Sequence, residues 1–242
     1  MKQIELILDE ETSSNYYIKE AFNSLRANIL FSKKDVKTIV LTSCLAHEGK
    51  SSVCFELCCN LAEAGKKILL VDADMRKSVM VTRYTNEKGM YGLSHILSGQ
   101  VSSADAIYST NVENLHIVFS GPYPPNPTEL IGSPAFKDFI DEYRDAYDYI
   151  IIDAPPLGLV VDAAVMSNVC DGAILVINVG HIKYRMALQV KAQLEKSGKK
   201  ILGVILNQVD RKKTIKSDYS FYATYFSESS DSYHTAEQKK KK

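Results

Sequence analysis

TIVLTSCLAHEGKSS, residues 38–52, is the stretch of sequence that decides the fold. It begins with a short apolar run typical of a strand, and Gly49-Lys50-Ser51 stands near its end, directly before a helical pattern. Strand, loop, Gly-Lys-Ser and helix in this order are the layout of a P-loop, which binds the phosphates of a nucleotide. The N-terminus of the helix offers phosphate unpaired backbone N–H groups and a partial positive charge. The sequence therefore predicts a site for a nucleoside triphosphate.

The P-loop residues have separate tasks in this interpretation. Lys50 would reach the β- and γ-phosphates, and the Ser51 hydroxyl would hold Mg²⁺. Gly49 would let the backbone approach the phosphates without a Cβ in the way. The usual pattern is G-x-x-x-x-G-K-[ST], and Cys44 stands where the first glycine would be. Because Gly-Lys-Ser also occurs by chance, the assignment depends on two further segments.

Both segments are apolar strands that end in carboxylates. The first, KILLVDADMRK at 67–77, contains Asp72 and Asp74, and the second, DYIIIDAPP at 148–156, contains Asp153. Continuous apolar runs indicate strands buried on both faces of a parallel sheet. Ligands bind at the carboxyl edge of such sheets, where these side chains would meet. Carboxylates suit a hard cation, here Mg²⁺ carried by the nucleotide.

Composition favours one large domain. The 242 residues are 45% hydrophobic, which is enough for one core, and the net charge is zero. We therefore expect no global field that recruits nucleic acid or a membrane surface. No apolar run approaches the ~20 residues that span a bilayer, and the N-terminus lacks a signal-peptide layout. The five cysteines have neither zinc spacing nor a disulfide framework, which predicts reduced, mostly buried thiols in a cytoplasmic protein.

Strands and helices alternate along the chain, which predicts an α/β fold with a mostly parallel sheet covered by helices on both faces. Beside the three strands above, strands are expected at 115–119, 173–179 and 201–206, and helices at 16–32, 50–64, 134–143, from 162, and at 184–196. Residues 1–15 are expected to be loosely ordered, and 75–110 to hold short helices around 93–97. The domain is predicted to cover residues 1–210.

Residues 211–242 differ in composition from the rest. Aliphatic residues are few, Ser, Lys and Asp are many, and four lysines close the chain at 239–242. Such a segment cannot bury enough apolar area to offset its ordering entropy, so we predict a flexible tail. The tail is nevertheless rich in aromatic residues: Tyr219, Phe221, Tyr222, Tyr225, Phe226 and Tyr233. The lysine run is interpreted as solvated charge, with attraction to anionic lipid or polymer as the alternative.

Together these segments resemble the bacterial tyrosine kinases of capsule and exopolysaccharide synthesis, in their stand-alone cytoplasmic form. The resemblance covers nearly the whole chain. The motifs that carry it are SCLAHEGKSS for Walker A, VDADMRK for a second acidic motif, YIIIDAPP for Walker B, GMYGLSHILSG, PPNPTELI and the tyrosine-rich tail. It implies a P-loop NTPase fold and ATP-dependent phosphorylation of tail tyrosines on a neighbouring subunit. It also implies a membrane-embedded modulator at the inner face of the cell membrane, and self-association into a ring.

The resemblance also implies a role for each matching residue. The catalytic set comprises Lys50, Asp72 and Asp74. The nucleotide-binding set comprises Glu48, Gly49, Lys50, Ser51, Ser52 and Asn207. The Mg²⁺ set comprises Ser51, Asp72, Asp74 and Asp153. The phosphorylation sites are Tyr219, Tyr222, Tyr225 and Tyr233, and the subunit contacts are Glu20 and Arg26. Asp72 would also draw the proton from the acceptor tyrosine, because a phenol with a pKa of about 10 is otherwise protonated.

Two places depart from the family pattern. Pro and Gly usually precede the Glu of the Walker A loop, whereas Leu45, Ala46 and His47 fill these places here. We therefore expect a stiffer loop. The first helix of the family carries E-x-x-R-x-x-R, in which Asn23 replaces the first arginine here.

Two other functions are alternatives to a kinase, and the first of them uses the same fold class. The main alternative is a partition- or division-site ATPase, which hydrolyses ATP and acts as a nucleotide switch. Such proteins carry an extra lysine early in the P-loop, and residues 44–48 contain none. They also lack a tyrosine-rich tail. A non-catalytic adaptor that uses nucleotide only as a switch is the second alternative. Labelled ATP separates the three functions by where the phosphate goes.

Overall fold

The computed structural model describes residues 1–8, 15–32 and 35–209, and residues 1–207 form one compact unit. In this part of the chain one sheet of eight strands has the order β1-β4-β5-β3-β6-β2-β7-β8. The strands are β1 Lys2–Ile4, β2 Thr38–Ser43, β3 Ile68–Asp72, β4 Tyr108–Thr110, β5 Leu115–Val118, β6 Tyr149–Asp153, β7 Gly172–Asn178 and β8 Lys200–Asn207. The β4–β5 pair is antiparallel and all other pairs are parallel, which confirms the predicted mostly parallel sheet.

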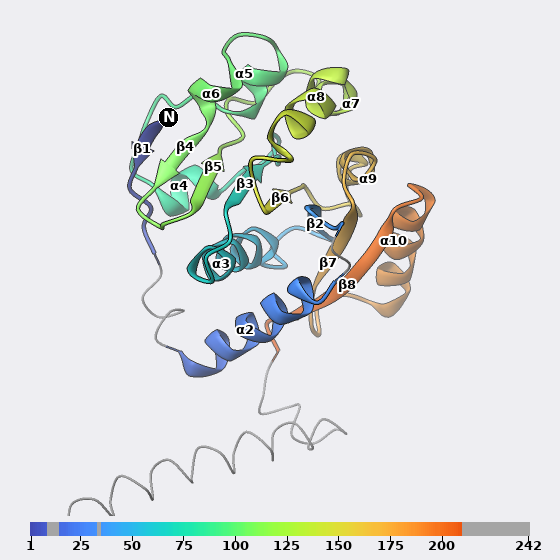
Figure 1. The fold of residues 1–242 in the computed structure, drawn as a ribbon. Helices are drawn as coiled ribbons and strands as arrows, with labels where there is room; N and C mark the ends of the chain where they lie inside the picture. Colours follow the sequence, from blue (N-terminus) through green and yellow to red (C-terminus); the bar gives the residue numbers. More distant parts are fainter. Residues whose placement is uncertain (9–14, 33–34, 210–242) are drawn as a thin grey trace, which may run out of the picture. The chain divides into compact units, whose positions relative to one another are not determined.

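Helices cover both faces of this sheet (Figure 1). They are α2 Tyr16–Leu30, α3 Lys50–Glu63, α4 Met80–Tyr84, α5 Leu93–Leu97, α6 Ser103–Ala106, α7 Pro127–Gly132, α8 Pro134–Tyr143, α9 Asp162–Ser167 and α10 Tyr184–Lys196. One hydrophobic core lies between the sheet and α2, α3 and α4, and a second lies between the sheet and α5 and α7 to α10. The predicted two-sided cover is therefore confirmed.

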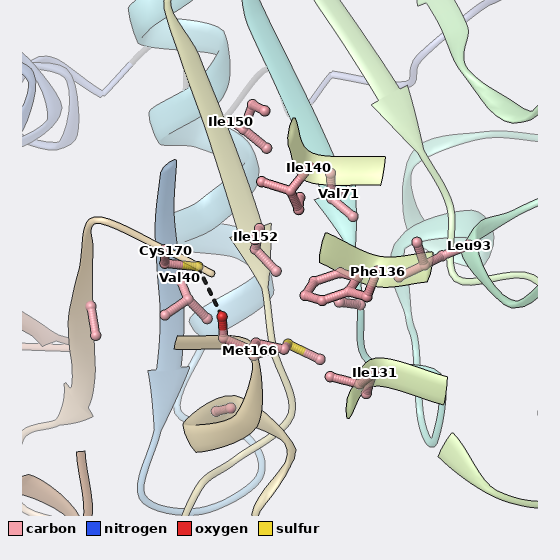
Figure 2. Packing of buried hydrophobic residues seen from close by; sticks show 14 of the residues in the cluster. Val40, Val71, Leu93, Ile131, Phe136, Ile140, Ile150, Ile152, Met166 and Cys170 are labelled. Atoms are coloured by element: carbon pink, nitrogen blue, oxygen red, sulfur yellow. Dashed lines mark hydrogen bonds between the residues drawn. The ribbon is translucent and has the colours of Figure 1, made fainter. Parts of the chain in front are cut away.

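The central strands feed both cores because successive side chains of a strand point to opposite faces. Along β3, Ile68 and Leu70 belong to the core with α3, while Leu69 and Val71 belong to the other. Figure 2 shows part of the second core, where Phe136 and Ile140 of α8 approach residues of β3 and β6. Continuous apolar sequence in these strands follows from burial on both faces.

The strand order places the predicted site residues at one edge of the sheet. β6 lies between β3 and β2, so the segments after all three strands meet at their carboxyl ends. Asp72 and Asp153 stand opposite one another in register at the ends of β3 and β6. The P-loop follows β2 directly and leads into α3.

The expectation that residues 1–15 are loosely ordered is wrong for the first eight residues. β1 pairs in parallel with β4, and Ile4 and Leu6 are buried. The amide of Leu6 also donates to Asn111 Oδ1 at 2.8 Å. A three-residue strand whose partner lies about a hundred residues away leaves no local periodic signal in the sequence. Residues 9–14 lie outside the described residues.

The remaining expectations concern the cysteines, membrane-spanning helices and the tail. All five cysteines are buried free thiols, as predicted. No helix of the described residues combines the length and hydropathy that crossing a bilayer requires. Residues 210–242, with all four predicted phosphorylation sites, lie outside the described residues. The boundary between domain and tail at 210 and 211 therefore stays a prediction.

Candidate active site

The P-loop turns through two left-handed residues before it enters α3. Gly49 has φ 77° and is the N-cap of the helix, and His47 has φ 66°. A glycine N-cap contributes no side chain to the first turn, which leaves the N–H groups there available for phosphate. Most L residues rarely adopt a positive φ, so His47 occupies a conformation suited to the glycine that is usual in this place.

Glu48 and Asn207 hold the P-loop in shape. The buried Glu48 carboxylate accepts hydrogen bonds from the amides of Leu45 at 2.6 Å and Asn178 at 3.0 Å. Asn207 Nδ2 donates to the carbonyl of Glu48 at 2.8 Å. The loop is thereby tied to the carboxyl ends of β7 and β8. Both residues were expected to bind the nucleotide. In the structure their side chains contact backbone atoms of the P-loop and, for Glu48, also the end of β7.

Lys50 lies at the centre of the site. Its buried ammonium forms an ion pair with Asp153 and donates to Ser51 Oγ at 3.2 Å. Burial opposes the charged ammonium, but Asp153 outweighs this effect and raises the pKa of Lys50. The second carboxylate oxygen of Asp153, Oδ2, is buried without a hydrogen-bond partner in the described structure. A buried carboxylate oxygen without a hydrogen-bond partner can accept a hydrogen bond from water or coordinate a cation.

Asp72 lies beside this pair and is fully buried. Its Oδ2 accepts hydrogen bonds from the Ser78 hydroxyl and from the Ser120 amide, the latter at 3.3 Å. Burial raises the pKa of Asp72 to about 7, and the nearby charge of Asp153 adds to this effect. A carboxylate with such a pKa can take up a proton near neutral pH, as a general base must.

Asp74 shapes the turn that follows β3. Its Oδ1 accepts hydrogen bonds from the amides of Arg76 at 3.3 Å and Lys77 at 3.0 Å. Arg76 in turn donates to the buried Asp162 of α9 through Nε at 2.7 Å and Nη2 at 3.2 Å. Nη2 also donates to Thr128 of α7 at 2.8 Å. This network links the turn after β3 to α7 and α9. It was not predicted from the sequence, although Arg76 lies within the quoted VDADMRK motif.

The segment after β6 can approach the P-loop closely because Gly158 has no side chain. A Cβ on Gly158 would lie 2.2 Å from the carbonyl oxygen of Cys44, which is far inside van der Waals contact. The amide of Leu157 donates to the Ser43 carbonyl at 2.9 Å. The segment after β6 is therefore packed directly against the start of the P-loop. The glycine was not identified from sequence, because its contact partner is more than a hundred residues away.

The donor set at this edge fits a magnesium ion that is bound together with a nucleotide. Ser51 Oγ, Asp72 and the unpartnered oxygen of Asp153 are oxygen donors, the kind that Mg²⁺ prefers. Among the described residues, no three His, Cys, Asp or Glu side chains are grouped as a complete metal site. Three protein oxygens are fewer than the six that octahedral Mg²⁺ takes, and Mg²⁺ usually binds through one or two carboxylates together with waters and substrate phosphates.

The remaining predicted residues have partners within the chain. Ser52 Oγ accepts a hydrogen bond from Arg83 of α4. On α2, Glu20 accepts from Asn23 Nδ2 at 3.0 Å, and Arg26 donates to the carbonyl of Asn60 on α3 at 3.1 Å. Contacts of Glu20 and Arg26 with another subunit remain a prediction.

The parallel sheet, the P-loop before α3 and the acidic strand ends define the chain as a P-loop NTPase. A sequence profile described as an AAA domain matches residues 36–201. Over 216 residues the chain is 43% identical to tyrosine-protein kinase CpsD from Streptococcus agalactiae, covering 89% of this chain and 94% of that protein. The crystal structure of the chimerical protein CapA2B2 superposes with a TM-score of 0.78 at 34% identity, covering 87% of this chain and 95% of that one. The chain belongs to the family of bacterial tyrosine kinases of capsule and exopolysaccharide synthesis.

The alternative class shares the fold as well. The septum site-determining protein MinD from Pyrococcus horikoshii, complexed with Mg-ADP, has a TM-score of 0.62 and 29% identity. That match covers 73% of this chain and 72% of that one, less than the CapA2B2 match. A division-site protein is thus built on the same fold, and the CapA2B2 match exceeds it in TM-score, in sequence identity and in the share of both chains covered.

Proposed function

We propose that this chain is an ATP-dependent protein-tyrosine kinase that phosphorylates tyrosines in the tail of another copy. The observation that carries the proposal is the arrangement of Lys50, Asp153 and Asp72 around the P-loop helix. A cation, a partly unpartnered carboxylate and a second buried carboxylate beside them can supply the positioning, the charge neutralisation and the proton acceptor that phosphoryl transfer to a phenol uses.

In the proposed reaction the phenol oxygen of the acceptor forms a bond to the γ-phosphorus, and the bond to the β–γ bridging oxygen breaks. Lys50 leaves Asp153 to contact the β- and γ-phosphates and neutralises the charge that develops there. Asp72 accepts the phenol proton. Magnesium supplies further charge neutralisation when it is bound, and Ser51, Asp72 and Asp153 would hold it, with Asp74 in support. Glu48 and Asn207 keep the loop amides in place for the phosphates.

The acceptors are tail tyrosines of a neighbouring copy. The support for this step is the tail sequence itself, which carries Tyr219, Tyr222, Tyr225 and Tyr233 within a polar segment. Tethering in an assembly raises the local concentration of such a tail at a neighbour's site. We further propose a cytoplasmic chain that a membrane-embedded modulator recruits to the inner face of the cell membrane, where it regulates capsular polysaccharide synthesis and export. Ring formation through Glu20 and Arg26 belongs to the same proposal.

Incubation with labelled ATP and Mg²⁺ tests the activity. The expected product is phosphotyrosine, which Lys50→Met should reduce by about 10²- to 10³-fold, since one preorganised charge is lost. Lys200→Met is the matched control, because Lys200 is an exposed lysine at the opposite end of the sheet. Free phosphate without phosphotyrosine would instead support the ATPase alternative. Parent-like tyrosine phosphorylation by the Lys50→Met protein would refute the site.

A further inference from the structure

A cavity of about 670 Å³ opens beside the proposed base. Ser78 and Ser120 line it, and both donate hydrogen bonds to the same carboxylate oxygen of Asp72. The Ser78 hydroxyl therefore links the lining of the cavity to Asp72, the carboxylate that would take the phenol proton. The Ser78 hydroxyl already makes the kind of hydrogen bond to Asp72 that an acceptor hydroxyl would make.

The size and lining of the cavity suit a tyrosyl side chain with its peptide neighbours. Sites for ligands of this size measure about 300–1,000 Å³. Phe119, Tyr91 and Tyr123 line the cavity, and aromatic faces pack well against a phenol ring. The segments after β3 and β5 and the loop before α5 form its walls, so the cavity belongs to the same carboxyl edge as the P-loop.

The charges around the cavity do not cancel. Arg76 is paired with Asp162, and Glu87 is paired with Lys2 at 2.9 Å. Two further lining residues, Lys77 and Lys88, are exposed, and neither ammonium forms an ion pair with a carboxylate in the described part of the chain. Among the residues that line the cavity, three cations (Arg76, Lys77 and Lys88) stand against one carboxylate (Glu87), so the lining carries a net positive charge. A peptide with an acidic residue near its tyrosine would meet a favourable potential there.

We propose that this cavity receives the acceptor tyrosine and that Lys77 and Lys88 select tyrosines with an acidic residue within three positions. The proposal rests on the kinase function proposed above. Three residues in extended conformation span about 10 Å. The flexible side chains of the two lysines at the rim can reach an acidic residue within this distance of the tyrosine. Because both partners are exposed, the preference is modest, and we expect a change of about five-fold in kcat/KM.

The preference orders the tail tyrosines of this chain. Tyr222 has no acidic residue within three positions on either side, whereas the other three have one each. The acidic neighbours are Asp218 for Tyr219, Glu228 for Tyr225 and Asp231 for Tyr233. Lys216 lies three positions before Tyr219 and offsets part of its preference. Tyr225 and Tyr233 should therefore be modified first and Tyr222 last.

Phosphorylation itself then supplies a missing acidic group. Tyr225 lies three positions after Tyr222, and a phosphate adds roughly −1.5 to −2 charges near neutral pH. Modification of Tyr225 should thus accelerate that of Tyr222. In a time course read by mass spectrometry, Tyr225→Phe should delay phosphate at Tyr222 by about five-fold. An unchanged rate at Tyr222 would contradict this step.

A charge swap between kinase and acceptor tests the selection. The kinase has its four tail tyrosines changed to Phe. The acceptor is the inactive Lys50→Met protein with Tyr222 as its one remaining tail tyrosine and with Ser220, Ser220→Asp or Ser220→Lys. The unaltered kinase should prefer the Asp acceptor over the Ser acceptor by about five-fold, mainly through KM, because the lysines do not touch the reacting atoms. The kinase with Lys77→Glu and Lys88→Glu should prefer the Lys acceptor.

The outcomes separate the two proposals. A Lys200→Glu kinase is the control and should keep the preference for the Asp acceptor. The inference is overturned if all three acceptors are used equally, or if the double variant keeps the preference of its parent. Efficient use of the Lys acceptor by the double variant also shows that this variant is folded. If the unaltered kinase phosphorylates no tyrosine at all, the kinase function fails as well.

Discussion

Replacement of Glu48 tests whether this residue supports the P-loop or binds the nucleotide directly. In Glu48→Ala the amides of Leu45 and Asn178 lose the acceptor that they share. Because Glu48 is buried, water replaces the carboxylate poorly, and each unsatisfied amide costs about 1–3 kcal/mol. We expect the free energy of unfolding to fall by about 3 kcal/mol.

The assay is urea unfolding without nucleotide, followed by a separate ATP titration. With a slope of about 2 kcal/mol per molar urea, a loss of 3 kcal/mol shifts the midpoint by about 1.5 M. Glu48→Gln keeps one acceptor oxygen and should lose about half as much. ATP affinity should fall by about ten-fold in Glu48→Ala, because the loop amides are no longer held for the phosphates.

The matched control is Glu113→Ala, an exposed glutamate that should change the stability by less than about 0.5 kcal/mol. If Glu48 instead served only as a nucleotide ligand, affinity would fall while the stability of the nucleotide-free protein stayed that of the parent. That pattern would show that Glu48 does not support the P-loop.

Two further predictions concern strain and pH. His47→Gly should raise the free energy of unfolding by about 1 kcal/mol in a urea titration, because glycine adopts the φ of 66° without steric penalty; equal or lower stability would contradict this. For Asp171, burial favours the protonated acid, but hydrogen bonds from Arg144 and from two backbone amides outweigh it and hold the pKa below its ordinary value. Its contribution to stability is therefore complete above an unfolded pKa of about 4 and is lost as pH falls through the lower folded value. The stability difference between parent and Asp171→Asn, from unfolding curves at pH 6 and pH 3, should shrink at the lower pH, and a constant difference would count against it.

The sequence predicted the central part of the sheet because the physical signals there are local. β3 and β6 are continuous apolar runs that end in carboxylates, and burial on both faces requires such runs. The P-loop could be located from Gly49-Lys50-Ser51 between a strand and a helix. From these two facts it followed that the P-loop and the acidic strand ends share one sheet edge. The ion pair between Lys50 and Asp153 at that edge was not predicted.

What the sequence did not predict depends on contacts between distant segments. β1 and β4 have three residues each, and β1 becomes a strand only because the chain returns to pair with it. The supporting role of Glu48 depends on an amide 130 positions away in the sequence. The cavity beside Asp72 combines segments that follow two different strands. No single segment of the sequence carries a signal for any of these features.

One mixing experiment measures directly whether phosphate passes from one copy of the protein to the tail of another. The inactive Lys50→Met protein with an intact tail is incubated with an active protein whose four tail tyrosines are changed to Phe, in ATP and Mg²⁺. We expect phosphate on the tail of the inactive protein, at a rate that rises with the concentration of the active one. An unlabelled inactive protein, together with wild-type protein that labels itself at a concentration-independent rate, would contradict it.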